Sequence, residues 1–359
     1  LTSGIGNVAI GSGSLATEDT GDKNTAVGTA ALANQNRDGT VGNTALGWHA
    51  GHSITTGHQN TLMGINTGGG STTASGSVLI GYSTGYDVTT GNMNIGIGRS
   101  ALNGGATTGD HNIAIGENTG QYITGASGSI LLGEYAGGEI TTGADNIAIG
   151  AYALGSVDGT ESLNIAIGRH AMSGSNANGV NKNIAIGHYA ADGMGTTGGN
   201  SDNIFIGYDA GGGTYNTGTC HYNVGIGNYV MDGAMNSVRY TVAIGYGAAS
   251  ALTQGDNGVF IGYNAGASVQ TGQRNLAIGS AAYDAASGDT QDNIAIGYAA
   301  LGDLNHNSSV RNIAIGNYAG DGMGTLAGST DNLFIGHNSG GGSWETAVST
   351  HNVAIGNET

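Results

Sequence analysis

The stretch Asn112-Ile113-Ala114-Ile115-Gly116 decides the fold, because it returns, with substitutions, twenty times between Asn7 and Gly356. We call its residues positions 1 to 5 and continue the count into the connection that follows. Position 5 is glycine in every copy, and position 1 is asparagine in sixteen copies. The exceptions at position 1 are Ser77, Ser129, Thr241 and Gly258. A repeat that returns every 17 to 20 residues is typical of a solenoid.

The spacing of the copies divides the chain into three parts. From Asn112 the steps are 17, 17, 18, 19, 20 and 20 residues, and the same series starts again at Thr241. We therefore expect six irregular coils in residues 1–111, a seven-coil block in 112–240 and its second copy in 241–359. Neither end carries the polar capping repeat that a solenoid needs. The sequence thus predicts that residues 1–359 are one β-solenoid segment of a longer fibre protein.

The composition argues against several functions. The chain has 72 glycines, no proline, eight Lys and Arg residues and a net charge of −17. Nucleic acids are not expected as partners, because binding to phosphates needs clustered basic residues. The single cysteine excludes an internal disulfide framework. No apolar run approaches the roughly 20 residues of a membrane-spanning helix, so we expect no membrane insertion.

Each copy predicts a short strand. The order Ile-Ala-Ile alternates large and small residues, as in a strand with two different faces, and no apolar pattern has helical spacing. The glycine at position 5 suits a tight bend. An apolar pair at positions 8 and 9, such as Ala153-Leu154, predicts a second strand in each coil. The expected fold class is all-β, a flattened parallel β-roll of about twenty coils.

Positions 3 and 9 vary together. Six coils have Leu or Phe at position 3, and all six have glycine at position 9. Thirteen coils have Ala or Gly at position 3 and also include a residue at position 9. Ten of them have a residue larger than glycine at position 9, and the three exceptions are Gly51, Gly120 and Gly320. A close-packed interior has a fixed volume, so we expect the two positions to share it. The six pairs are Leu62–Gly68, Leu79–Gly85, Leu131–Gly137, Phe205–Gly211, Phe260–Gly266 and Phe334–Gly340.

Positions 2 and 4 then point outward and form a long apolar stripe. At ~4.8 Å per strand the stripe would run roughly 90 Å, far beyond the few hundred Å² of apolar patch that a monomer exposes. The simplest cover is the same stripe on identical chains around a rotation axis, which predicts a homo-oligomeric fibre. The expected interface residues include Ile113, Ile115, Ile147, Ile149, Ile184, Ile186, Ile294 and Ile296.

The asparagines at position 1 predict a structural ladder. Stacked amide side chains hydrogen-bond along the axis of an assembly in which equivalent strands lie above one another. We expect this ladder to include Asn112, Asn146, Asn183, Asn203, Asn293 and Asn312.

The first coil, Asn7-Val-Ala-Ile-Gly-Ser-Gly-Ser-Leu-Ala, resembles the head repeats of the YadA-like trimeric autotransporter adhesins. Later coils, such as Asn43-Thr-Ala-Leu-Gly, are more similar to the related repeats of phage tail-fibre proteins. The resemblance implies a left-handed parallel β-roll, three chains per fibre and attachment to cell surfaces. It therefore implies an extracellular location, on the virion surface or on a bacterial cell surface. The coils here are longer than those of the adhesins, which favours the phage fibres.

Aromatic residues are the best candidates for receptor binding, because Tyr suits sites with one apolar and one wet side. They follow position 5 in many coils, and the alternative is that they only cover the corner of the roll. We predict that a host-surface glycan or protein receptor contacts a subset of them. This subset is Trp48, Tyr152, Tyr189, Tyr208, Tyr298, Tyr318 and Trp344.

No catalytic residue, metal site or cofactor is predicted. His49 and His52 are the only histidines close in sequence, and solvated turns explain them better than a metal. Ca²⁺ is a minor alternative at the acidic connections, where Asx turns are the simpler reason. These connections contain Asp110, Asp145, Asp202, Asp292 and Asp331.

Three alternative functions remain open. One is a polysaccharide-degrading tailspike with carboxylates at a groove between chains, and another is a bacterial adhesin that binds extracellular matrix. The third is ice binding, which needs a regular row of threonines. Threonine occupies position 2 only at Thr25, Thr44 and Thr61. The leading prediction is a non-catalytic attachment fibre.

Overall fold

The structure is a computed structural model that describes residues 3–156, 159–174, 179–194, 199–215, 218–286, 288–304, 308–323, 328–342 and 349–359. Over these residues the chain is a parallel β-solenoid without helices. This confirms the predicted all-β class and the repeating coils. The chain divides into two compact units, Leu1–Gly174 and Ser175–Thr359. The division falls inside the first seven-coil block, so it does not follow the repeat in the sequence.

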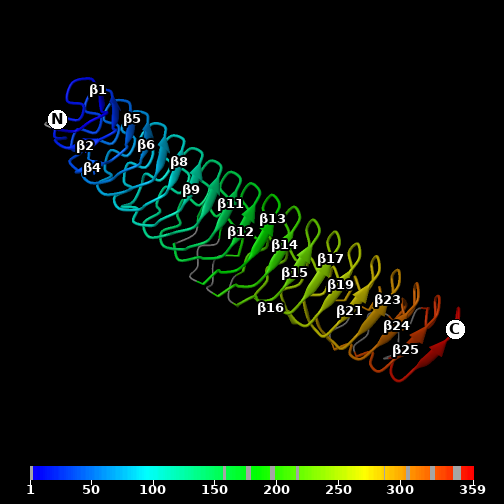
Figure 1. Cartoon of the computed structure of the whole chain (residues 1–359). Helices are drawn as coiled ribbons and strands as arrows, with labels where there is room; N and C mark the ends of the chain where they lie inside the picture. Colours follow the sequence, from blue (N-terminus) through cyan, green and yellow to red (C-terminus); the bar gives the residue numbers. More distant parts are fainter. Residues whose placement is uncertain are drawn as a thin grey trace. The chain divides into compact units, whose positions relative to one another are not determined.

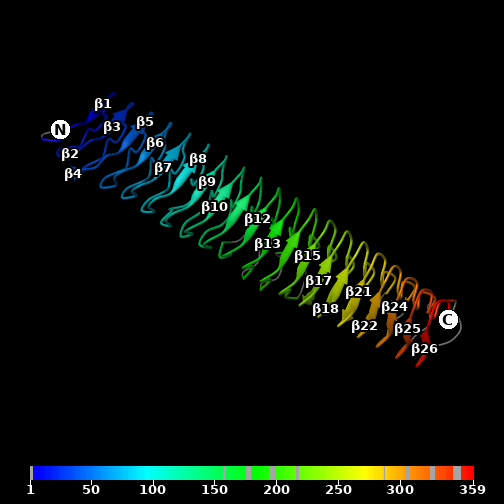
Figure 2. The same ribbon diagram turned by 45° about the vertical axis from the view of Figure 1, so that its right-hand side comes forward.

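In the first unit, each copy of the repeat forms one three-residue strand from its positions 2 to 4 (Figures 1 and 2). Equivalent positions pair in parallel, so Ile130 lies beside Ile113 and also beside Ile147. The strands are β1 (Val8–Ile10), β3 (Thr25–Val27), β5 (Thr44–Leu46), β6 (Thr61–Met63), β7 (Val78–Ile80), β8 (Ile95–Ile97), β9 (Ile113–Ile115), β10 (Ile130–Leu132), β11 (Ile147–Ile149) and β12 (Ile165–Ile167). A smaller parallel pair is formed by β2 (Gly21–Asp22) and β4 (Gly39–Thr40).

The second unit repeats this arrangement, and its strands follow one another in the same register. They are β13 (Ile184–Ile186), β14 (Ile204–Ile206), β15 (Val224–Ile226), β17 (Val242–Ile244), β19 (Val259–Ile261), β21 (Leu276–Ile278), β23 (Ile294–Ile296), β24 (Ile313–Ile315), β25 (Leu333–Ile335) and β26 (Val353–Ile355). A second parallel sheet contains β16 (Ser237–Arg239), β18 (Gln254–Asp256), β20 (Thr271–Gln273) and β22 (Asp289–Gln291).

The predicted second strand at positions 8 and 9 is wrong. Ala153 and Leu154 are fully buried, but they lie in a turn, with φ of 60° at Tyr152 and 48° at Leu154. Left-handed residues at positions 7 and 9 bend the chain twice, so the apolar pair reaches the interior without pairing as a strand. Where the described residues form a second strand, it lies in the connection before position 1, as β16 does before Thr241.

The predicted packing of position 3 against position 9 is confirmed. A Cβ atom added to Gly85 would lie 2.5 Å from Leu79 Cδ1, and one added to Gly137 would lie 2.7 Å from Leu131 Cδ2. The three glycines that break the rule within a coil face a large residue of the following coil. A Cβ on Gly120, for example, would lie 2.9 Å from Leu131 Cδ1. The interior is therefore filled jointly by neighbouring coils.

Candidate functional site

The outer surface formed by positions 2 and 4, which we call the isoleucine face, is apolar and only half covered. Position 3 of each strand points inward, and Ala114 and Ala148 are fully buried. Its neighbours point outward, and Ile115 is 38% exposed. The other predicted interface residues are partly exposed; they are Ile113, Ile147, Ile149, Ile184, Ile186, Ile294 and Ile296. None of the twenty copies carries a charge at position 2 or 4.

The asparagines at position 1 are buried and linked from coil to coil. Asn203 Nδ2 donates to Asn183 Oδ1 at 3.0 Å and to the Cys220 carbonyl oxygen at 2.9 Å. Asn203 Oδ1 in turn accepts from the backbone N–H of Asn223 at 3.1 Å and from its Nδ2 at 3.0 Å. Asn112, Asn293 and Asn312 make equivalent side-chain bonds to the coils on either side. The Asn146 side chain bonds to the following coil, through Glu161 and Asn164.

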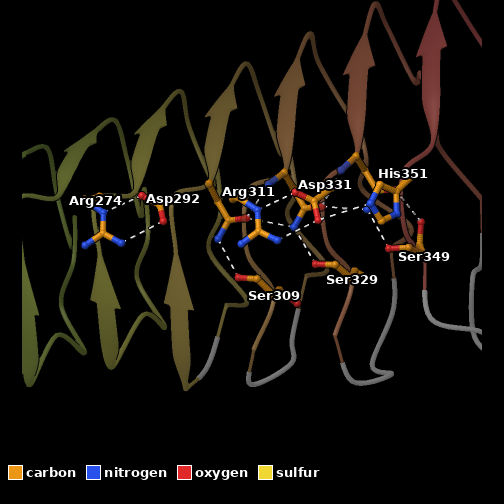
Figure 3. A network of polar contacts seen from close by, with 11 residues as sticks. Arg274, Asp292, Ser309, Arg311, Ser329, Asp331, Ser349 and His351 are labelled. Carbon is orange, nitrogen blue, oxygen red and sulfur yellow. Dashed lines mark hydrogen bonds and ion pairs between the residues drawn. The ribbon is translucent and has the colours of Figure 1, made fainter.

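Charged residues just before position 1 form a second ladder in the second unit (Figure 3). Arg274 Nε lies 2.6 Å from Asp292 Oδ1, and Arg311 Nε lies 2.6 Å from Asp331 Oδ1. The hydrogen bond from each arginine, with its charge, holds the pKa of Asp292 and Asp331 below the usual range. His351 continues the row, with its Nε2 3.9 Å from Asp331 Oδ2. These pairs are exposed to solvent, so each contributes little to stability.

The aspartates of the acidic connections have a structural role that needs no bound Ca²⁺. Asp145, Asp202, Asp292 and Asp331 all lie directly before position 1 with φ between 57° and 59°. Asp is one of the few residues besides glycine that adopts this left-handed backbone readily. Asp110 accepts a hydrogen bond from the backbone N–H of Asn92 at 2.6 Å. Within the described ranges, no group of three or more His, Cys, Asp or Glu side chains is placed to hold a metal ion.

Aromatic side chains stack along each unit. In the first unit, Tyr152 lies between Tyr135 at 5.3 Å and His170 at 5.1 Å, with all three rings nearly parallel. Trp48 stacks on His49, and His49 stacks on His52.

In the second unit most of the ring contacts are edge to face, and a few are stacked. Tyr208 meets Tyr189 at 6.3 Å and Tyr229 at 5.3 Å, both edge to face. Tyr298 and Tyr318 form another such pair, and Trp344 lies outside the described residues. The structure thus brings most of the predicted aromatics into ladders. Sequence reasoning missed a stacked pair, Tyr222–Tyr240, whose members both lie directly before position 1.

In the second unit, Asp209 lies close enough to Asp192 of the preceding coil and to Asp232 of the following coil to repel each of them. Burial, together with the smaller effect of the Asp209 charge, raises the pKa of Asp192 and of Asp232 to about 6. Asp192 and Asp232 each occupy position 10 of their coils, and Asp209 occupies position 7 of the coil between them. Their charged forms therefore destabilise the fold at neutral pH.

We expect Asp192→Asn and Asp232→Asn each to stabilise the protein at pH 8 and to have little effect at pH 4. Between pH 3.8 and about 6 the folded state binds more protons than the unfolded state, so stability falls as the pH rises through this range. Because these carboxyls are half exposed, solvent screening reduces the expected gain to about 1 kcal/mol. Urea unfolding at both pH values measures it. Asp145→Asn, at an exposed position, is the control, and an equal gain at pH 4 and pH 8 would contradict the explanation.

The architecture and these surfaces define a repeat protein of the parallel β-solenoid class. No protein-family model matches the sequence, and a search of curated proteins found no match. Among the residues with described positions, none forms a helix long and apolar enough to cross a membrane.

Proposed function

We propose that the chain is a segment of a non-catalytic homotrimeric fibre that attaches to a host cell surface. In this proposal each chain is a left-handed β-roll, and three chains meet through their isoleucine faces. The fibre lies outside the cell, on a virion as a tail fibre or, as the second choice, on a bacterium as an adhesin. Its partners are two further copies of itself and a glycan or protein receptor on the host.

The observation that carries the proposal is the half-covered isoleucine face. Position 4 is apolar in all twenty copies, and position 2 is apolar in all but the three with threonine. A surface of this size and composition is unfavourable in water unless another surface covers it. An identical chain fits best, because each unit carries the same row of apolar residues in the same parallel register.

The role in attachment is supported by what the remaining surface offers. The net charge of −17 keeps a long assembly soluble, and the aromatic ladders present several half-exposed rings in register. Tyrosine contributes large contact areas at low entropic cost in recognition surfaces. Repetition along three chains adds avidity to contacts that are individually weak.

We expect Ile184→Asp combined with Ile186→Asp to weaken or abolish the association of chains. Two carboxylates on the isoleucine face would be desolvated without a partner on assembly. Sedimentation velocity measures the change, and circular dichroism shows whether the coils remain folded. The matched control is Ile184→Val combined with Ile186→Val, since valine occurs naturally at position 2, as Val224, and at position 4, as Val27. A folded Asp variant with the mass of the unmodified protein would refute the proposed interface.

A further inference from the structure

A groove of about 390 Å³ opens beside the aromatic ladder of the first unit. It lies across three successive coils, which begin at Asn112, Ser129 and Asn146. Its volume is at the lower end of the roughly 300–1,000 Å³ of small-ligand pockets, which suits a ligand of one or two sugar rings. The lining residues are Gln121, Tyr122, Tyr135, Gly138, Glu139, Tyr152, Gly155 and Ser156.

Two glycines at position 10 create the groove. Gly138 and Gly155 occupy this position in consecutive coils, and no other consecutive pair of coils has glycine there. Gln121 precedes them at the same position and Ser173 follows, so side chains occupy position 10 on both sides. The floor is held in tight turns, because Gly138 N donates to the Tyr135 carbonyl at 3.1 Å and Gly155 N to the Tyr152 carbonyl at 3.0 Å.

The aromatic walls of the groove are fixed in place. Tyr135 and Tyr152 stack at 5.3 Å with 12° between their planes. Tyr122 packs on Gly104, where a Cβ atom would lie only 2.8 Å from the ring, and its backbone N–H donates to the Gly138 carbonyl at 3.0 Å. The stacked rings leave no space between them, so a ligand contacts Tyr122 and the outer edges of the pair. Tyr122 is 45% exposed and is therefore accessible to a ligand.

The polar groups of the groove match a sugar. The exposed Glu139 carboxylate accepts hydrogen bonds, the Gln121 amide donates and accepts them, and the tyrosine hydroxyls do both. Aromatic rings beside such groups suit a ligand with apolar C–H faces and polar hydroxyls. No Lys, Arg or His is among the residues that line the groove, and the chain is strongly acidic, which disfavours anionic ligands.

We propose that this groove binds one neutral sugar unit of a surface glycan. The proposal rests on the proposed attachment function for the source of the ligand, and it adds the ligand class and the residues that contact it. Tyr122, Tyr135 and Tyr152 contact the ring of the sugar, and Glu139 and Gln121 accept and donate hydrogen bonds to its hydroxyls.

The test is titration of the purified chain with methyl glycosides of glucose, galactose, mannose and N-acetylglucosamine, followed by saturation-transfer NMR. We expect at least one probe to bind in the millimolar range, and Tyr152→Ala and Glu139→Gln each to weaken it tenfold or more. Alanine is tolerated at position 7, where Ala30 has a φ of 56°. Gly138→Gln, which copies Gln121 of the preceding coil, fills the groove and abolishes binding.

The matched control is Tyr263→Ala. Tyr246 and Tyr263 stack at 5.5 Å with 13° between their planes, but neither lines this groove. Binding is retained in this variant if the groove is the site. Lack of binding by all four probes, or equal loss in Tyr263→Ala and Tyr152→Ala, overturns the proposal. A chain that binds a probe in the groove but is monomeric in solution contradicts the proposed fibre instead, so the two failures are distinct.

Discussion

Replacing Gly85 with leucine is expected to destabilise the coils around it by about 3 kcal/mol, because overpacking a close-packed core costs roughly 1–3 kcal/mol and this site is tightly filled. A Cβ on Gly85 would lie 2.5 Å from Leu79 Cδ1 and 2.8 Å from Cδ2. The backbone is not the obstacle, since Leu102 occupies the same position in the next coil with a φ of 55°. Urea unfolding measures the loss, and hydrogen exchange locates it.

The double variant Leu79→Ala, Gly85→Leu tests whether the destabilisation comes from excess side-chain volume in the interior. It moves the large side chain from position 3 to position 9, which is the arrangement that Ala148 and Leu154 have naturally. We expect its stability to lie within about 1.5 kcal/mol of the unmodified protein, as for other volume-conserving changes. If the effects of the two single substitutions simply add, the two positions do not share one interior space.

Asn203→Ala is expected to cost about 3 kcal/mol, because an unpaired buried polar group costs roughly 1–3 kcal/mol and this change leaves more than one. The amide is fully buried, and its Oδ1 accepts from the backbone N–H of Asn223 at 3.1 Å. Its Nδ2 also donates to the Cys220 carbonyl at 2.9 Å. The loss appears as a lower free energy of unfolding and as faster exchange of the Asn223 amide proton.

Asn203→Ser is the matched control for the asparagine ladder. Serine occurs naturally at position 1, where Ser129 Oγ accepts from the backbone N–H of Asn146 at 3.3 Å. The serine variant should therefore keep the amide proton of residue 223 protected and lose less stability than the alanine variant. Equal losses in both variants would show that the ladder hydrogen bonds do not determine stability at this position.

Much of the fold was predictable because comparison of the repeat copies shows which positions alternate in size and which vary together. The alternation of Ile-Ala-Ile fixed which residues face inward, and the buried Ala114 and Ala148 agree with it. The exchange of volume between Leu79 and Gly85 was also visible, since twenty copies in one chain act as a set of natural variants. Both signals depend on residues within one coil.

The features that the sequence did not reveal depend on backbone conformation or on neighbouring coils. Leu154 was expected in a strand, because an apolar pair gives no sign of the left-handed turn that buries it. Gly120 does not follow the packing rule within its own coil, because the side chain that fills the space beside it is Leu131 of the next coil.

The candidate sites divide in the same way. The recurrence of tyrosine after position 5 predicted rows of rings, and Tyr152 does stack between its neighbours. The groove was not predicted, because it requires glycine at position 10 of two consecutive coils, as Gly138 and Gly155, and glycine has no functional side chain.

The mass of the unmodified protein in solution tests the central claim, that copies of the chain cover one another's isoleucine faces. Light scattering coupled to size-exclusion chromatography gives this mass without assuming a shape. The account predicts a stable species of three times the 35.3 kDa of one chain. A folded protein that stays at the mass of a single chain at micromolar concentration would contradict it.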